Sequence, residues 1–227
     1  MDAFTPEDIG RLFSPLAPRY RRFNRWASLG QDNRWRRSLI AEIEGRRRVL
    51  DVGTGTGELA ALAAARGASA VGLDVSPGML EEARRRWPSG AWVLGDGKTF
   101  PFPAGAFDAV VSAYVMRNLF KGGVLPNVLR EARRVLAPDG RLVFLDLTRP
   151  EGVFQRWGHG LYNRTILPAL GRWFFGEHWP GDYLADSIDA LPPADELRTI
   201  FQTCGFRSLT VRPLWGGVVS LFIGSDA

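Results

Sequence analysis

Three aspartates and a glycine-rich loop are the residues whose types and spacing could do chemistry in this chain of 227 residues. The loop reads Gly53-Thr54-Gly55-Thr56-Gly57 and follows a short apolar run that ends in Asp51 and Val52. Its glycine spacing differs from the G-x-G-x-x-G of dinucleotide-binding proteins, and no Lys-Ser/Thr pair follows it, as a P-loop requires. An acid this close to the loop would repel a pyrophosphate but could bind an ammonium group. The loop therefore predicts a ligand that carries a cation.

Asp74 and Asp96 follow the next two apolar runs. An acid at the position of Asp74 is well placed to bind the two hydroxyls of a ribose. Asp96 lies in LGDGK, where its carboxylate or the amide of Gly97 could meet the edge of an adenine. Any one of these acids could instead cap a turn or a helix. Together with the glycine loop, the three acids favour a cationic ligand that carries a ribose and an adenine.

The elements that must position these residues alternate between apolar runs and helical patterns from residue 49 onward. Strands are predicted in RVLDVG, ASAVGLD, AWVLGD, FDAVVSAYV and GRLVFLDL, with helices between them, which is typical of βαβ units and a parallel sheet. Ser76 before Pro77 predicts a helix N-cap, and GVLPNVLREARRVLAP predicts a helix that PDG terminates. SLTVRPLWGGVVSLFIG predicts a hairpin that turns at WGG. We therefore expect a Rossmann-like α/β fold, a mostly parallel seven-stranded sheet with a C-terminal antiparallel hairpin and helices on both faces.

We expect a single domain with two additions to its core. Residues 1–48 are predicted to be a helical, basic and aromatic segment, and residues 49–227 form the core, in which residues 151–190 look like an insertion. Residues 11–48 hold eleven arginines against three acids, Asp32, Glu42 and Glu44. Such a segment suits an anionic ligand, a nucleic acid or an anionic membrane surface, and a solvated helical face is the simpler alternative.

The rest of the composition excludes several classes of protein. One cysteine cannot form an internal disulfide framework, and Cys204 lies in an amphipathic pattern that favours a small core residue. With only two histidines besides it, we expect no metal site. The N-terminus has no apolar secretory region, and no stretch is apolar for the 18 or so residues that span a bilayer. We expect a cytoplasmic protein.

The acid followed by G-x-G-x-G resembles the first motif of the class I S-adenosylmethionine-dependent methyltransferases. The resemblance implies S-adenosyl-L-methionine as the cofactor and S-adenosyl-L-homocysteine as the product. It implies cofactor contacts from the loop, from the strand ends and from their neighbours, and Thr56 could add a hydroxyl contact. The full cofactor set is Asp51, Gly53, Gly55, Thr56, Gly57, Asp74, Val75, Asp96, Gly97 and Ala113.

The stretch SAYVMRNLF after the fourth predicted strand bears on the methyl acceptor. It lacks the acid or Asn followed by Pro-Pro and an aromatic that is typical of enzymes methylating exocyclic amino groups, and the chain lacks the two cysteines for attack on a pyrimidine. Nucleic-acid methylation therefore loses most of its support, despite the basic N-terminal segment. The stretch resembles the F-G-L-R-N motif of the ubiquinone/menaquinone biosynthesis C-methyltransferases, with Arg117 and Asn118 retained and Tyr114 and Val115 in place of Phe-Gly.

This resemblance extends over most of the chain. YRRFNRWASLGQDNRW is similar to the family's Y-D-x-M-N-x-x-x-S-x-G-x-H-x-x-W, with Asp32 in place of the His. RVLAPDGRLVFLDLTRP, LYNRTILPALG, YLADSIDALP and LWGGVVSLFIG are similar to further family segments. The resemblance implies that a ring carbon of a prenylated hydroquinone, of the demethylmenaquinol kind, is methylated in quinone biosynthesis.

Carbon methylation needs a ring made nucleophilic by an adjacent hydroxyl, and therefore a base or a cation that stabilises a phenolate. Arg117 is the candidate cation, and Asn118 and Tyr20 could orient the hydroxyl or a water. Asp146, at the end of the fifth predicted strand, is the candidate base, and His159 and Tyr162 are weaker candidates.

The expected partner is a lipophilic quinol. The aromatic residues of 151–190 could line a groove for its tail, and the basic N-terminal segment could rest on the inner face of an anionic membrane as a peripheral contact. A homodimer is left open. Two alternatives also stay open: a methyltransferase for another small molecule, and a protein that binds S-adenosylmethionine or nucleic acid without turnover.

Overall fold

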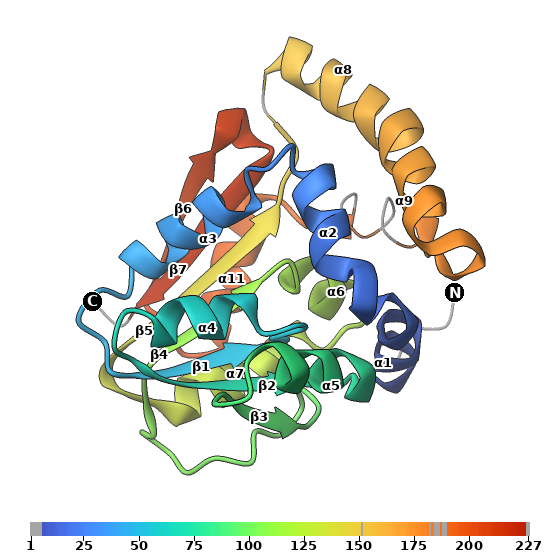
Figure 1. Ribbon diagram of the computed structural model, residues 1–227. Helices are drawn as coiled ribbons and strands as arrows, with labels where there is room; N and C mark the ends of the chain where they lie inside the picture. Colours follow the sequence, from blue (N-terminus) through green and yellow to red (C-terminus); the bar gives the residue numbers. More distant parts are fainter. Residues whose placement is uncertain (1–5, 151, 182, 184–186, 188–189, 226–227) are drawn as a thin grey trace.

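The computed structural model describes residues 6–225 except 151, 182, 184–186, 188 and 189. A seven-stranded sheet in the order β3-β2-β1-β4-β5-β7-β6 organises it (Figure 1). The strands are β1 Arg48–Val52, β2 Ser69–Asp74, β3 Ala91–Leu94, β4 Phe107–Ala113, β5 Leu136–Leu147, β6 Ser208–Leu214 and β7 Val219–Ser225. The first five strands pair in parallel, and β7 pairs antiparallel with both β5 and β6. The predicted sheet and its C-terminal hairpin are confirmed.

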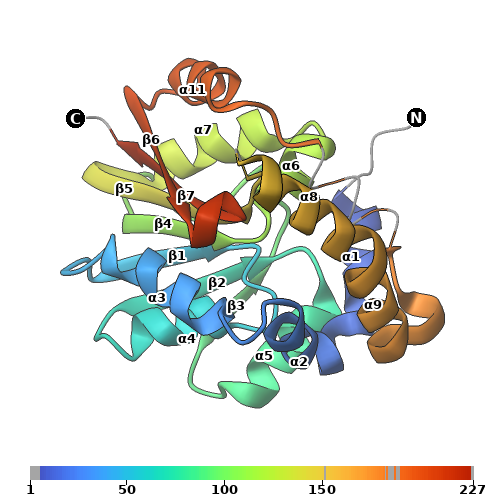
Figure 2. The same cartoon turned by 90° about the horizontal axis from the view of Figure 1, so that it is seen from above.

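Helices cover both faces of the sheet (Figure 2). They are α1 Pro6–Phe13, α2 Ala17–Ala27, α3 Asp32–Ala41, α4 Glu58–Ala64, α5 Pro77–Arg86, α6 Met116–Lys121, α7 Leu125–Val135, α8 Val153–Leu161, α9 Leu167–Phe175 and α11 Ala194–Thr203. Four short turns complete them: η1 Ser14–Leu16, η2 Tyr162–Ile166, η3 Gly176–His178 and η4 Trp215–Gly217. One buried cluster joins the sheet to α7 and α11, and a second joins its other face to α3 and α4. None of the described helices has the length and apolar character of a membrane span.

Local sequence explains most of these elements. Strand β1 is buried from Val49 to Val52, as expected for a parallel strand covered on both faces. In α7, Leu125, Val128, Leu129, Ala132 and Val135 are buried at helical spacing. The predicted cap of α5 is confirmed, because Ser76 Oγ accepts a hydrogen bond from the amide of Met79 at 3.2 Å.

One predicted boundary was wrong. Helix α7 ends at Val135 rather than at the PDG turn, and Leu136 already belongs to β5, where it pairs with Phe107. The backbone turns extended at Leu136, with ψ 137°. A proline disfavours helical geometry in the residue before it, so Pro138 keeps Ala137, the residue after Leu136, extended.

Residues 152–181, most of the predicted insertion, form helices α8 and α9 with the short turns η2 and η3. These helices lie beyond the sheet, and α9 packs against α2 (Figures 1 and 2). Leu16 and Phe23 from the N-terminal segment share a third buried cluster with Leu167, Phe174 and Phe175. Two segments far apart in sequence are thus packed together, while the division into a core with two additions stays a prediction.

Candidate functional site

The glycine loop folds tightly between β1 and α4. Gly53, Gly55 and Gly57 have φ of 66°, 56° and 84°, a left-handed conformation that glycine adopts without a steric penalty. The amides of Gly53 and Thr54 donate to the carbonyl of Leu73, at 2.8 and 3.0 Å, which ties the loop to the end of β2. The loop therefore lies at the carboxyl edge of the sheet, where open parallel sheets bind their ligands.

Asp51 supports this loop from behind. Its carboxylate is 1% exposed, and Oδ2 accepts hydrogen bonds from Thr54 Oγ1 at 2.6 Å and from the amide of Ala60 at 3.1 Å. Burial raises the pKa of Asp51 to about 7, although these hydrogen bonds and Arg36 lower it. Asp51 does not line the adjoining cavity, so its contact with a ligand ammonium stays a prediction.

Asp74 is the strand-end acid that lines the cavity. Oδ2 accepts a hydrogen bond from the amide of Gly55 at 2.7 Å, and Oδ1 accepts one from the amide of Ser76 at 2.8 Å. Burial raises the pKa of Asp74. Asp96 instead closes its own turn, because Oδ1 accepts from the amides of Lys98 and Thr99, and the cavity meets Gly97 rather than Asp96. The structure therefore brings only one of the three acids to the cavity.

This first cavity collects most of the predicted cofactor set. The predicted members that line it are Gly53, Gly55, Thr56, Asp74, Val75, Gly97 and Ala113, and Asp51, Gly57 and Asp96 do not. Asn118 also lines it, and its buried Oδ1 has no hydrogen-bond partner among the described residues. A buried acceptor without a partner is costly unless a ligand donor completes it. The hydroxyls and amino groups of S-adenosylmethionine are such donors, so the residues present fit this cofactor.

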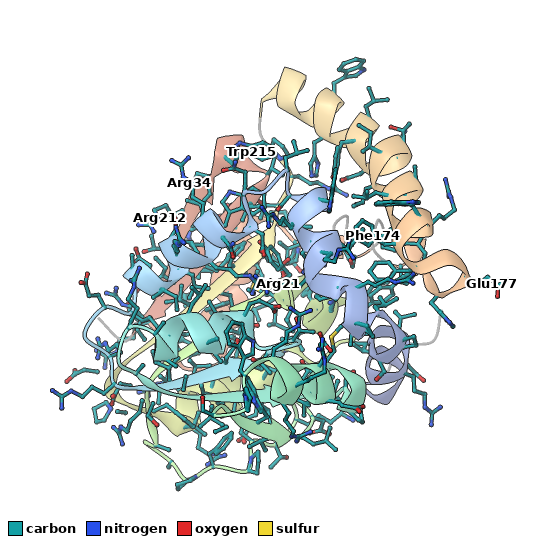
Figure 3. The ribbon with its side chains drawn as sticks, viewed as in Figure 1. Arg21, Arg34, Phe174, Glu177, Arg212 and Trp215 are labelled. Atoms are coloured by element: carbon teal, nitrogen blue, oxygen red, sulfur yellow. The ribbon has the colours of Figure 1, made fainter. Side chains whose placement is uncertain are left out.

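A second and largely apolar cavity of about 440 Å³ adjoins the first. It lies between α2 and α3, the α8–α9 helices and the C-terminal hairpin, and its apolar walls include Phe23, Leu167, Phe175 and Trp179. Tyr20 and Tyr114 line both cavities. A ligand in one cavity would therefore lie next to a ligand in the other. Figure 3 labels Phe174 on α9 and Trp215 on the C-terminal hairpin, two of the elements around the second cavity.

Arg117 lines the second cavity from the start of α6, on the side of Tyr20. Its Nη1 donates to Asp146 Oδ1 at 2.5 Å and to the carbonyl of Tyr114 at 2.9 Å, and its Nε donates to Ser187 Oγ at 3.2 Å. Nη2 has no hydrogen-bond partner in the part of the chain that the structure describes. Burial raises the pKa of Tyr20, while the charge of Arg117 lowers it. A guanidinium and a phenol thus approach the apolar cavity together.

Asp146, the predicted base, is enclosed by protein donors. Asp146 is 0% exposed and lines neither cavity. Both of its oxygens are occupied, since Oδ1 accepts from Arg117 Nη1 and the amide of Leu147 while Oδ2 accepts from the amide of Arg117. A carboxylate enclosed in this way holds Arg117 in place, and its role as the base stays a prediction. The weaker candidate Tyr162 is also engaged, because its hydroxyl donates to the carbonyl of Ala27 at 2.7 Å.

A model of the ubiE/COQ5 methyltransferase family matches residues 1–226. The chain belongs to this family. A demethylmenaquinone methyltransferase of Thermus thermophilus is 38% identical over 94% of this chain and 99% of its own. One of Symbiobacterium thermophilum is 34% identical over 96% of this chain and 92% of its own.

Solved structures of S-adenosylmethionine-dependent methyltransferases share the fold of this ubiE/COQ5 family member. One from Thermotoga maritima superposes with a TM-score of 0.67 at 16% identity, covering 96% of this chain and 99% of that one. A phosphoethanolamine methyltransferase of Haemonchus contortus, solved with S-adenosylhomocysteine, gives 0.63 at 14% identity over 87% and 53% of the two chains. The predicted fold is confirmed. With the family match, the prediction of an S-adenosylmethionine-dependent methyltransferase is confirmed as well.

Sequence reasoning missed one cluster in this family member. The hydroxyl of Tyr114 donates to Asp32 Oδ1 at 2.9 Å, and Arg36 Nε donates to the same oxygen at 3.0 Å. The Arg36 guanidinium also lies over the Tyr114 ring, 5.1 Å from its centre. Asp32 and Tyr114 are both departures from the family pattern, and only the fold shows that they contact each other. The available signal was that Asp32 is the one acid among the arginines of residues 11–41.

Proposed function

We propose that this chain methylates a ring carbon of a prenylated quinol of the demethylmenaquinol class. The observation that carries the proposal is the larger apolar cavity, which meets the cofactor cavity at Tyr20 and Tyr114 and contains the guanidinium of Arg117. An aromatic head and an isoprenoid tail suit apolar walls, and a ring hydroxyl suits a few fixed polar groups. The names of the curated relatives support the same substrate class.

In the proposed cofactor site, Asp74 accepts hydrogen bonds from the two ribose hydroxyls. Each of its oxygens already takes one backbone hydrogen bond and keeps further acceptor capacity. Gly53, Gly55 and Thr56 of the loop, with Val75, Gly97 and Ala113, surround the cofactor, and Asn118 Oδ1 accepts from a cofactor amine. Asp51, Gly57 and Asp96 keep the loops in shape from outside the cavity.

In the proposed acceptor site, Arg117 stabilises the charge that develops on the quinol oxygen. Because Nη1 and Nε are held by protein partners, Nη2 is directed without reorganisation when the charge forms. Tyr20 lines both cavities and orients the hydroxyl. S-adenosylmethionine supplies the methyl group on a positively charged sulfur. The adjoining cavities support a methyl donor bound beside the ring, and that proximity would supply much of the rate enhancement.

A membrane surface is the proposed source of the quinol. Exposed large apolar side chains gather on α2, the turn after it and the α8–α9 helices: Trp26, Leu29, Trp157, Leu161, Ile166 and Trp173. Exposed arginines on the same elements include Arg22, Arg25, Arg164 and Arg172. Aromatic and basic side chains together favour the interface of an anionic bilayer. We call this set the arginine–tryptophan patch. The oligomeric state stays a prediction.

Methyl transfer from labelled S-adenosylmethionine tests the proposed function. Demethylmenaquinol and demethoxyubiquinol analogues are compared as acceptors, and the product is analysed for a new carbon–methyl bond. We expect C-methylation of the naphthoquinol, and a rate loss of about 10² to 10³ in Arg117→Met, the cost of removing one preorganised donor. Cofactor binding without transfer to either quinol would favour another acceptor or a protein without turnover. An undiminished rate in Arg117→Met would remove the role given to Arg117.

A further inference from the structure

We propose that Asp32 is the base that accepts the hydroxyl proton of the acceptor in this chain. The inference rests on the proposed function and assigns the proton transfer to a carboxylate that lines the second cavity, as Asp146 does not. Asp32 is the first residue of α3 and lines the second cavity. Tyr114, which contacts it, lines both cavities, so Asp32 lies close to where donor and acceptor meet.

The hydrogen bonds of Asp32 leave one of its oxygens available. Oδ1 accepts from both Tyr114 and Arg36, and no described residue donates to Oδ2. The backbone amide of Asp32 donates to Ser28 Oγ at 3.1 Å, which fixes the start of the helix. Its side chain keeps 10% exposure in a largely apolar cavity. This carboxylate is therefore held rigidly by one oxygen, with the other open to a ligand.

Charged and phenolic groups face Asp32 from several elements. Arg36 faces it from its own helix, Tyr114 from the segment after β4, and Tyr20 from α2, with Arg117 beyond Tyr20. Burial raises the pKa of Tyr114 well above its usual value, so this phenol stays protonated and donates to Asp32. The nearby cations attract an anionic substrate oxygen, while the carboxylate takes the proton.

The proposed step balances without an oxidant or a reductant. The hydroxyl gives its proton to Asp32 Oδ2 while the ring carbon forms a bond to the methyl group, and the broken carbon–sulfur bond leaves its electron pair on sulfur. The methylated carbon then loses its hydrogen as a proton to water. Asp32 returns its own proton to the ring oxygen, which restores the aromatic quinol. One proton is released for each methyl transferred.

The first test replaces Asp32 by its neutral isostere. We expect kcat of Asp32→Asn to fall by about 10² to 10⁴, the usual contribution of a general base, with unchanged affinity for S-adenosylhomocysteine by calorimetry. Asp195→Asn is the matched control, because Asp195 also lies in the first turn of a helix and pairs with an arginine of that helix, but is exposed. A quinol analogue whose hydroxyl has a lower pKa should recover much of the Asp32→Asn rate. If Asp32→Asn loses as much rate with this analogue as with the ordinary quinol, the proposal is overturned.

A second variant keeps the proposal testable if Asp32→Asn does not fold. Asp32→His with Tyr114→Phe restores the family pattern at both positions and replaces a carboxylate base by an imidazole. We expect the acid limb of its kcat–pH profile to move up towards about 6.5, the ordinary pKa of histidine. An unmoved limb would exclude Asp32 as the base. If the unmodified chain transfers no methyl to any quinol, the proposed function fails and takes this inference with it. If the unmodified chain methylates a quinol and Asp32→Asn is as active as Asp195→Asn, the function stays intact and the base alone is overturned.

Discussion

The guanidinium of Arg117 and the carboxylate of Asp146 form a buried ion pair, with Nη1 and Oδ1 2.5 Å apart and side chains 3% and 0% exposed. The pair joins the start of α6 to the end of β5. Burying two charges is costly, and mutual attraction with further hydrogen bonds offsets that cost. Tyr114 and Ser187 supply some of those bonds. The pair therefore fixes one guanidinium orientation at the wall of the second cavity.

Removing Asp146 should destabilise the fold strongly. Asp146→Ala leaves the Arg117 charge buried without its partner, so we expect a loss of about 3 to 5 kcal/mol in the free energy of unfolding. Urea denaturation measures it. Asp195→Ala breaks an exposed pair instead and should cost less than about 1 kcal/mol. If the two variants lose similar free energies of unfolding, burial does not set the cost of breaking the Arg117–Asp146 pair.

Asp74→Asn should weaken cofactor binding more than it lowers turnover at saturation. The amide nitrogen of Asn would face a backbone N–H of Gly55 or Ser76, and one ribose hydroxyl would lose its charged acceptor. Hydrogen bonds to charged groups contribute about 1.5 to 3 kcal/mol, which corresponds to about 10- to 150-fold in affinity. Calorimetry with S-adenosylhomocysteine measures this change. Unaltered affinity would show that the ribose lies elsewhere.

Stability should fall between pH 5 and pH 8 because of Asp51. Its pKa of about 7 in the folded chain lies above the ordinary value of 3.8, so folding favours its protonated form. The stabilising contribution is complete below the unfolded pKa and is lost as pH rises through the folded pKa. We expect a decline of up to about 3 kcal/mol over this range, at 1.36 kcal/mol for each pKa unit.

Urea denaturation at several pH values measures this decline, and Asp51→Asn should flatten it. Asp108→Asn is the control, because Arg48 lowers the pKa of Asp108, whose contribution is lost only in more acidic solution. If the free energy of unfolding of Asp51→Asn still declines with pH as in the unmodified chain, the decline does not come from Asp51.

The arginine–tryptophan patch should bind anionic bilayers. Trp157 and Trp173 are 73% and 69% exposed, so replacing both by Ser removes apolar contact with little effect on the fold. Co-sedimentation with vesicles of phosphatidylglycerol and phosphatidylcholine should show binding by the unmodified chain, a clear loss in the double variant, and weakening by salt. Leu94→Ser removes an exposed apolar side chain from β3, remote from the patch, and should bind as before. Equal binding to neutral vesicles would show that the arginines of the patch do not contribute to membrane binding.

Local patterns in the sequence determined the sheet, the glycine loop and the acids at or near the ends of β1, β2 and β3. Parallel strands are short apolar runs, and their carboxyl ends meet at one edge, so Asp51, Asp74 and Asp96 could be placed near one another from spacing alone. Which acid faces the cavity could not be predicted, because side-chain direction at a strand end depends on the turn that follows. Asp51 and Asp96 each turn towards backbone amides, and Asp74 reaches the cavity while holding two.

Only the tertiary structure decided which polar groups pair around the acceptor. Asp146 reaches Arg117 across 29 residues, and Asp32 reaches Tyr114 across 82. Sequence periodicity cannot predict such long-range contacts. They form when α3, α6 and the ends of the central strands pack at one edge of the sheet. In a low-dielectric interior, each charge binds the partner that packing brings nearest. The sequence therefore contained both aspartates, but only packing made Asp146 a buried partner of Arg117 and placed Asp32 in the wall of the second cavity.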